Sequence, residues 1–205
     1  VYVKFKIKSG QHFTLGSVPD NSYFLAWTTT PWTLPGNVAL AVAPGNAGIG
    51  YVGWRVGKEN YILAGELAGK IFPDFDEQKA ETLVSSDLIG LEYEPLFPYF
   101  VSTITENEKF KLKNAYKIYV ADFVNTTDGT GIVHTAVMYG QDDFELGTKV
   151  DLPKYHLVSP EGKFIQGTEF LEGRFVKEKD EKGKPTLDVD IIKYLTDKNL
   201  FFKKE

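Results

Sequence analysis

The sequence predicts a β-rich protein, of the all-β or α+β class, in which a distorted closed β-barrel is decorated with a few short helices. Aromatic residues make up 14% of the 205 residues, with 15 Phe and 11 Tyr against one Met. Aromatic and β-branched residues favour strands. Short apolar runs, separated by turn-forming residues, fill the first two thirds of the chain, and several short strands joined by such turns are typical of a barrel.

The strands are expected between clusters of Gly, Pro, Asn and Asp, the clearest of which are 20–21, 44–46 and 127–129. The opening segment alternates between apolar and charged residues with a period of two, as a half-buried strand does. The expected strands are 2–8, 22–28, 38–43, 49–56, 60–64, 116–121 and 130–135.

Helical signals are fewer. Segment 65–70 is expected to form a short helix, and 142–149 carries acids where the first turn of a helix favours them. Near the end, Asp188 or Asp190 is expected to cap a helix, because apolar side chains follow at helical spacing. Those side chains are Ile191, Ile192, Leu195 and the stem of Lys198. One domain is expected over 1–205, with a barrel core to about 150 and a small αβ tail over about 151–205.

Composition excludes several classes of site. The chain has no Cys, which removes disulfides, thiolate nucleophiles and Cys-based metal sites and favours a reducing, cytoplasmic location. The three His residues, 12, 134 and 156, lack metal-ligand spacing, so no metal is expected. No apolar run is long enough for a membrane span.

Charge argues against a dedicated nucleic-acid binder. The net charge is −5, whereas such proteins are normally basic. RNA delivered by a neighbouring domain stays compatible with this charge. Two lysine clusters, over 109–117 and 177–184, are interpreted as solvated faces. The charged segment 176–186 contains Gly and Pro and is expected to be a linker or an exposed loop.

The first segment that carries chemistry is 27–37, Trp-Thr-Thr-Thr-Pro-Trp-Thr-Leu-Pro-Gly-Asn. Two prolines stiffen it, and threonine hydroxyls both donate and accept hydrogen bonds. Gly36 is expected to adopt a conformation that other residues resist. The segment is either a rigid ledge that presents several hydroxyls or a strand connection with incidental threonines.

The second segment, 128–144, combines a turn, a strand end at His134, a loop and a helix start at Asp142 and Asp143. A strand end and a helix start separated by a short loop can converge on one pocket, where His134 offers an imidazole and Asp143 a carboxylate. The alternatives are a structural histidine at a strand end and two acids that only cap the helix.

Both segments resemble the editing (CP1) insertion of isoleucyl-tRNA synthetases, which are class I aminoacyl-tRNA synthetases. The first matches the threonine-rich peptide of that domain. The second matches its Gly-Thr-Gly-Ile-Val-His signature, followed at the same spacing by Gly-x-Asp-Asp. Valyl and leucyl relatives carry Thr-Thr-Arg-Pro, so Thr30 and Trp32 indicate the isoleucyl branch. The resemblance covers essentially the whole chain. It departs at Val137, where the family has Pro, and this change is expected to loosen the loop before Asp143.

The resemblance implies that the domain hydrolyses valine from mischarged Val-tRNA(Ile) by water attack on the ester. Asp143 is then the ammonium anchor and His134 lines the side-chain pocket. The wall that contacts the terminal adenosine and orients water comprises Thr28, Thr29, Thr30, Trp32 and Asn37. Among these residues the catalytic set is Asp143, Thr30, Asn37 and His134, and no general base is assigned.

The resemblance also implies partners and cofactors. The partners are the 3′ end of tRNA(Ile) carrying valine and the rest of the synthetase in cis, from which the domain is excised. The isolated domain is expected to be a monomer without a cofactor, since any ATP, magnesium or zinc belongs to the parent enzyme. Because HIGH-like and KMSKS-like signatures are missing, no aminoacylation is expected.

Three other readings stay open: a valyl or leucyl editing domain, a free-standing deacylase, and a non-catalytic β-barrel module that binds RNA or protein.

Overall fold

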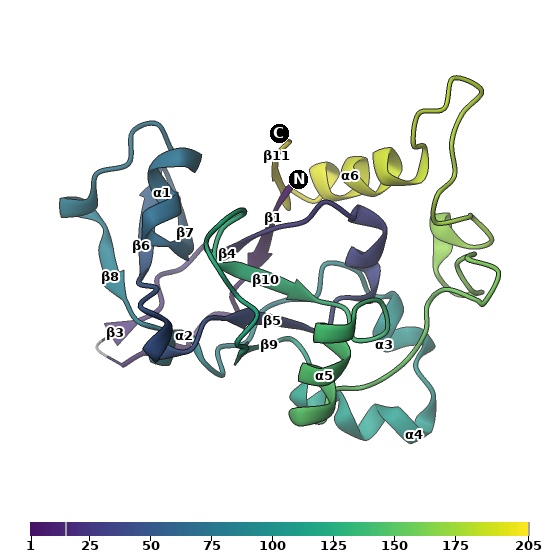
Figure 1. The fold of residues 1–205 in the computed structure, drawn as a ribbon, viewed down its shortest axis with the longest axis horizontal. Coiled ribbons are helices and arrows are strands. Elements are labelled where there is room, and N and C mark those ends of the chain that lie inside the picture. Colours follow the sequence, from purple (N-terminus) through teal and green to yellow (C-terminus); the bar gives the residue numbers. More distant parts are fainter. Residues whose placement is uncertain (15, 205) are drawn as a thin grey trace.

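The computed structural model describes residues 1–14 and 16–204, and leaves Leu15 and Glu205 outside the description. Strands lie at the centre and short helices surround them (Figure 1). The larger sheet has six strands, and all its pairs are antiparallel except β4 with β7. In spatial order they are β11 (Phe201–Lys203), β1 (Tyr2–Lys6), β4 (Ser22–Trp27), β7 (Glu59–Ala64), β6 (Tyr51–Val56) and β8 (Glu81–Leu83).

The smaller sheet has three strands. Its central strand β5 (Ala39–Val42) pairs antiparallel with β10 (Ile132–Thr135) and parallel with β9 (Lys117–Val120). A separate hairpin joins β2 (His12–Phe13) to β3 (Gly16–Ser17). The seven strands expected from the sequence are thus confirmed. The four strands that were not expected, β2, β3, β8 and β11, are two or three residues long and carry too little periodicity to be seen.

The two sheets are joined at both sides. Isolated bridges connect Ile7 with Tyr93 and Glu92 with Lys117, which links β1 to β9. On the other side, the Ala64 amide donates to the Thr130 carbonyl at 2.8 Å. Among the described strands no continuous ladder closes a barrel, so the architecture is one of mixed sheets with short helices. Closure into a barrel stays a prediction.

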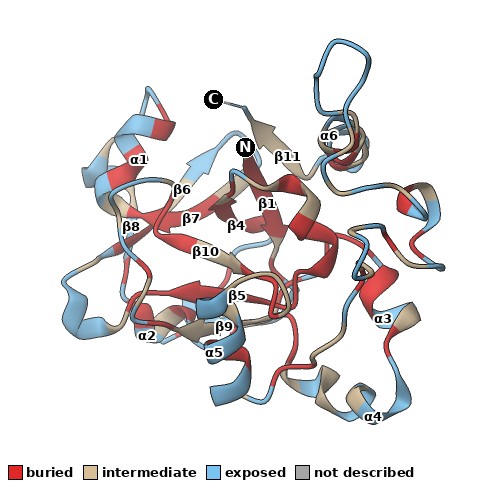
Figure 2. Cartoon of the chain, turned by 45° about the vertical axis from the view of Figure 1, so that its right-hand side comes forward, coloured by how far each residue is buried: buried red, intermediate tan, exposed pale blue. Residues whose placement is uncertain are grey.

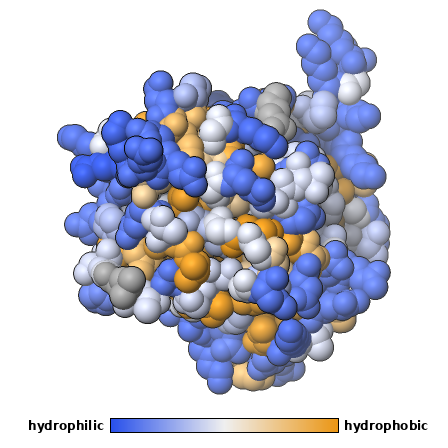
Figure 3. Space-filling view, turned by 60° about the vertical axis from the view of Figure 1, so that its left-hand side comes forward, coloured by the Kyte–Doolittle hydropathy of each residue, from blue (hydrophilic) through white to orange (hydrophobic). Residues whose placement is uncertain are grey.

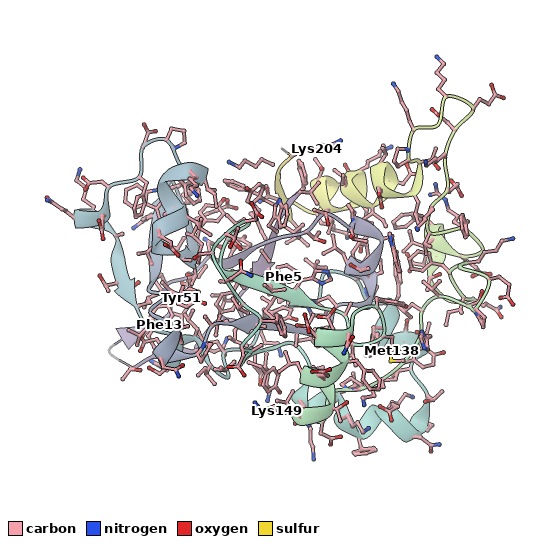
Figure 4. The ribbon with its side chains drawn as sticks, viewed as in Figure 1. Phe5, Phe13, Tyr51, Met138, Lys149 and Lys204 are labelled. Carbon is pink, nitrogen blue, oxygen red and sulfur yellow. The ribbon has the colours of Figure 1, made fainter. Side chains whose placement is uncertain are left out.

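The core lies between the two sheets. The residues of β4 and β5 are buried almost without interruption, which explains why these strands read as continuous apolar runs instead of alternating ones. Figure 2 shows this buried centre, and Figure 4 places Phe5 among the central strands. Lys4 of β1 is the charged residue among the buried described residues, at 3% exposure. Its ammonium lies 3.0 Å from the Glu59 carboxylate and forms an ion pair with it.

The three expected helices are confirmed as α1 (Gly65–Ile71), α5 (Gln141–Lys149) and α6 (Leu187–Asp197). Three unexpected helices have only four or five residues: α2 (Ser85–Leu88), α3 (Tyr99–Thr103) and α4 (Glu106–Lys109). Short 3₁₀ helices occur at η1 (Pro31–Gly36), η2 (Gly45–Ala47), η3 (Glu77–Lys79), η4 (Phe110–Asn114) and η5 (Glu169–Leu171). In the described part of the chain, no helix combines the length and apolar character that crossing a membrane requires.

The expected cap of α6 is wrong. Thr186 occupies the N-cap position without a side-chain hydrogen bond to the helix, and Asp188 and Asp190 lie inside the first turn. Both carboxylates have other partners: Asp188 accepts from the backbone amide of Trp32, and Asp190 pairs with Arg174 at 2.7 Å. Acids in the first turn still favour the helix dipole.

The segment before α6 is exposed and extends away from the body, as the charged composition of 176–186 predicts. The same hydrophilic projection stands above the surface in the space-filling view (Figure 3). The domain boundary near residue 150 stays a prediction.

Tyr51 of β6 links the two sheets and supplies a test of the fold. Its buried hydroxyl accepts from the Ala43 amide and donates to the Gly131 carbonyl, both at 2.9 Å (Figure 4).

Tyr51→Phe leaves both backbone groups unpaired, so we expect a loss of about 1–3 kcal/mol in the free energy of unfolding, measured in urea. The control is Tyr155→Phe, since the Tyr155 hydroxyl has no hydrogen-bond partner among the described residues. Equal stability of the two variants would contradict this role.

Candidate functional site

The two motifs line one cavity of about 500 Å³. One wall is the threonine ledge, which we define as residues 27–33. The facing wall runs from the turn at 128–131 through β10 to the start of α5, and Figure 1 shows β10 beside β4. The lining residues of the two motifs are Trp27, Thr28, Thr29, Thr30, Trp32, Thr33, Asp128, Gly129, Thr130, Gly131, Ile132, Val133, His134, Ala136, Tyr139, Gly140, Gln141, Asp142 and Asp143, and Phe123 and Asn125 complete the cavity.

The threonine ledge is fixed by its own hydrogen bonds. The Thr30 amide donates to the Thr28 hydroxyl at 3.0 Å, and the hydroxyls of Thr29 and Thr30 lie 3.3 Å apart. The Thr30 carbonyl accepts from the Thr33 amide at 3.1 Å, and η1 begins at Pro31, directly after this N-cap residue. Proline is favourable there because the first turn of a helix needs no donor. The expected rigid ledge is therefore a 3₁₀ turn.

Packing, and not backbone conformation, requires a glycine at position 36. The expected unusual conformation of Gly36 is therefore wrong. Its φ angle is outside the left-handed region, and a Cβ atom built there lies 2.7 Å from the Cε2 atom of Tyr139. The Tyr139 ring also packs edge-on against Trp32, with 5.1 Å between ring centroids. Tyr139 thus joins the threonine ledge to the loop that follows β10.

His134 is a neutral imidazole in the cavity wall. Its Nε2 atom lies 3.0 Å from the Thr33 hydroxyl, which in turn donates to the Thr30 carbonyl at 2.9 Å. Because the hydroxyl proton is used in that way, the Thr33 oxygen accepts from Nε2–H, and Nδ1 keeps its lone pair. Nδ1 is buried and has no partner among the described residues. Burial lowers the pKa of His134 to about 4, so the ring is uncharged near neutral pH.

Asp143 is the half-buried acid of the cavity. It lies in the first turn of α5, and its side chain folds over Gly140. A Cβ atom added at Gly140 would lie 2.4 Å from the Asp143 Oδ2 atom. Burial raises the pKa of Asp143 to about 6, and repulsion from Asp142 adds to this, while a hydrogen bond from the Ala136 amide opposes it. The carboxylate does not cap its own helix, because Gly140 is the N-cap residue and no side chain makes a cap hydrogen bond.

The loop before Asp143 packs against α5 through Val137. Val137 is 2% exposed and packs against Gly147 of α5. A Cβ atom added at Gly147 would lie 2.6 Å from the Val137 Cγ2 atom. The Tyr139 amide donates to the Ala136 carbonyl at 2.9 Å and closes a turn. Val137 thus packs the loop against α5, and the expected loosening relative to proline stays a prediction.

The charge of the cavity has one sign. Its charged lining residues in the described chain are Asp128, Asp142 and Asp143, with no Lys or Arg. A cavity with this lining attracts a cation, and its half-buried carboxylate strengthens a direct bond to one. In the described part of the chain, no three His, Asp or Glu side chains are placed to hold a metal ion.

Asn37 lies outside the cavity, unlike the six other expected site residues. It is 4% exposed, and its amide donates to the Ala39 carbonyl at 2.9 Å and accepts from the Tyr93 hydroxyl at 2.6 Å. The sequence reasoning missed Thr33 and Tyr139, which contact His134 and Trp32. Thr33 follows Thr30 at the spacing of one 3₁₀ turn, a signal that was available. Phe123 carries no comparable signal.

Comparison with known proteins agrees with this geometry. No family model matches the sequence. The isoleucine--tRNA ligases of Clostridium novyi (strain NT) and Clostridium tetani (strain Massachusetts / E88) are 39% and 40% identical over 204 residues. The chain is a homologue of the isoleucine--tRNA ligases. The isoleucyl branch that Thr30 and Trp32 indicate is thereby confirmed. These matches cover 100% of the chain but 17% of each relative, so it spans about a sixth of their length.

A solved structure supports the fold of this isoleucine--tRNA ligase homologue. The CP1 domain of a leucyl-tRNA synthetase, GlLeuRS-CP1, has a TM-score of 0.50 at 20% identity. The likeness covers 73% of this chain and 60% of that one. At this identity it concerns the fold alone.

The raised pKa of Asp143 predicts a pH-dependent cost in stability. Its pKa in the folded protein is about 6, above its usual 3.8, so protonation stabilises the folded state. This contribution is complete below pH 3.8 and lost as the pH rises through 6. Asp143→Asn should therefore raise Tm at about pH 8 and leave it unchanged at about pH 4. Thermal unfolding checks this, with exposed Asp74→Asn as the control, and the same change in Tm at both pH values would contradict it.

Proposed function

We propose that this isoleucine--tRNA ligase homologue hydrolyses valine from mischarged Val-tRNA(Ile). The observation that carries the proposal is the single cavity between the threonine ledge and the segment from His134 to Asp143, with its acidic lining. Such a site is needed because a pocket built for isoleucine rejects valine poorly, isoleucyl-tRNA synthetase being the standard example of this limit. A second site that admits only the smaller side chain removes the error.

Asp143 binds the free ammonium of the valyl group. That ammonium distinguishes an aminoacyl ester from other esters, and a half-buried carboxylate forms a short, strong bond with it. A hydrogen bond from the Ala136 amide helps to hold the carboxylate in place. Once the ammonium is bound, its charge favours the ionised carboxylate and offsets the cost of burial.

His134 limits the size of the side chain that enters. Its uncharged ring is fixed by Thr33, so it presents a rigid wall to an apolar group without a charge to be desolvated. Isoleucine carries one methylene more than valine and meets this wall first. Trp32, held by Tyr139, supplies an aromatic surface for the terminal adenosine.

Hydrolysis proceeds by attack of water on the ester carbonyl carbon. The bond to the ribose oxygen breaks, that oxygen takes a proton, and valine leaves with its new carboxylate. The hydroxyls of Thr28, Thr29 and Thr30 orient the water and stabilise the developing oxyanion, which is positioning without a covalent enzyme intermediate. Asn37 acts from behind the wall, by holding the chain after the threonine ledge through Ala39 and Tyr93. No general base is assigned.

The wider proposal concerns the setting of the domain. The 3′ end of tRNA(Ile) and the rest of a synthetase in cis are its partners, and the isolated chain activates no amino acid. The bridges that link β1 with β9 and Ala64 with Thr130 support a distorted barrel around the site. A cytoplasmic location, a monomeric state and hydrolysis without a resident cofactor stay predictions.

Loss of the anchor tests the activity. We expect the chain to release valine from Val-tRNA(Ile), and Asp143→Ala to abolish release. For the unchanged chain, kcat/KM should fall about tenfold between pH 7 and pH 5, since one unit below a pKa of about 6 about a tenth of the carboxylates are ionised. The residual activity of Asp143→Asn should lack this fall. Near-normal release by Asp143→Ala would refute the anchor role.

Removal of the histidine wall tests the size limit. His134→Ala enlarges the cavity, so we expect the variant to hydrolyse Ile-tRNA(Ile), which the unchanged chain spares. The measurement is the ratio of deacylation rates for the valyl and isoleucyl esters. His12→Ala is the matched control, because His12 lies on the β2–β3 hairpin and contacts Ser17 instead of the cavity. A variant that still spares the isoleucyl ester shows that His134 has another role.

A further inference from the structure

A second, smaller cavity of about 210 Å³ lies against the threonine ledge. It shares Thr29, Thr30 and Trp32 with the first cavity, so one wall separates two compartments. Its remaining lining residues come from the segment before α6 and from the first turn of that helix. They are Val176, Lys177, Glu178, Lys179, Pro185 and Asp188.

The segment that forms the second cavity is a closed hairpin, residues 176–186. The Asp180 carboxylate accepts from the amides of Lys182 at 2.8 Å and Lys184 at 2.9 Å. A β-bridge pairs Lys179 with Pro185. This hairpin is therefore shaped by its own hydrogen bonds, although it projects into solvent (Figure 1).

The base of the hairpin is tied to α6 and to the threonine ledge. Arg174 pairs with Glu178 and with Asp190 of α6, both at 2.7 Å. Asp188 accepts from the backbone amide of Trp32. These contacts fix the second cavity relative to the wall that it shares with the first.

The charges of the second cavity differ from those of the first. Glu178 is neutralised by Arg174 and also accepts from the Thr186 hydroxyl. Lys177 and Lys179 are exposed, and neither forms an ion pair within residues 1–14 and 16–204. Two unpaired ammonium groups thus stand beside the apolar surfaces of Trp32, Val176 and Pro185.

The size of the second cavity indicates a subsite. Independent small-molecule sites enclose roughly 300–1,000 Å³, and this cavity, at about 210 Å³, is smaller. A compartment of this size next to a larger one suits one unit of a ligand that continues into its neighbour. An aromatic side chain on which a nucleotide base can stack, with cations beside it, is the arrangement that binds single-stranded nucleic acid.

We propose that the second cavity binds the nucleotide that precedes the terminal adenosine of an RNA 3′ end. Lys177 and Lys179 contact its phosphate, and its base lies against Trp32, Val176 and Pro185. This inference rests on the proposed function, which places the terminal adenosine in the first cavity. It explains how a domain whose first cavity is acidic holds a polyanion: two lysines line the neighbouring cavity, where the RNA backbone passes.

Binding of a short single-stranded RNA ending in CCA to the 205-residue chain tests the proposal directly. Fluorescence anisotropy at several salt concentrations gives the slope of log K against log salt. For Lys177→Ala/Lys179→Ala we expect a slope shallower by about 0.7, since the two lysines contact one phosphate and each neutralised single-strand phosphate contributes about 0.7. The matched control, Lys182→Ala/Lys184→Ala, removes the same charge from the hairpin outside the cavity and should keep the slope. Equal slopes for the two double variants, or no binding by the unchanged chain, overturn the proposal.

Two substrates separate this inference from the proposed function. The Lys177→Ala/Lys179→Ala variant should raise KM for Val-tRNA(Ile) and hydrolyse valyl-adenosine, which lacks the preceding nucleotide, at the unchanged rate. An equal loss on both substrates overturns the subsite. If the unchanged chain hydrolyses neither substrate, the proposed function fails, and the salt slope still decides whether the second cavity binds RNA.

Discussion

The site depends on the packing of the threonine ledge against the segment that leaves β10. The hydrogen bond between Thr33 and His134 joins residues that are 101 positions apart. Tyr139 makes a second connection, by lying on Gly36 and against Trp32. Neither motif encloses a cavity alone, because each offers only one wall. The strands β4 and β10, which lead into the two walls, hold these walls at a fixed separation.

This packing also sets the electrostatics of the cavity. Burial lowers the pKa of His134 to about 4 and raises the pKa of Asp143 to about 6, so the usual order of the two pKa values is reversed in this cavity. Groups held in an unfavourable state are typical of functional sites. A bound cation would favour the ionised carboxylate and offset the cost of its burial, which is why Asp143 is the proposed anchor for an ammonium group.

Local pattern predicted much of the fold. β5 and β10 were expected because continuous apolar residues and nearby turns mark buried strands, and α5 because its acids come first. The short helices α2 to α4 were not predicted from the sequence, since four or five residues span barely one helical turn. The cap of α6 was wrong because Asp188 bonds to Trp32, a tertiary contact that no local pattern contains. Asn37 shows the same limit at the site: its sequence neighbours line the cavity, but its own side chain turns into the core.

The central claim is that a valyl group lies between the two walls with its ammonium on Asp143. A crystal structure of the chain with a non-hydrolysable valyl-adenosine analogue, in which an amide replaces the ester, tests it most directly. The account predicts the ammonium within hydrogen-bonding distance of the Asp143 carboxylate, the isopropyl group against His134, and the adenosine beside Trp32. An ammonium held by Asp128 or Asp142 with Asp143 left unbound, or an analogue bound away from the threonine ledge, would contradict it.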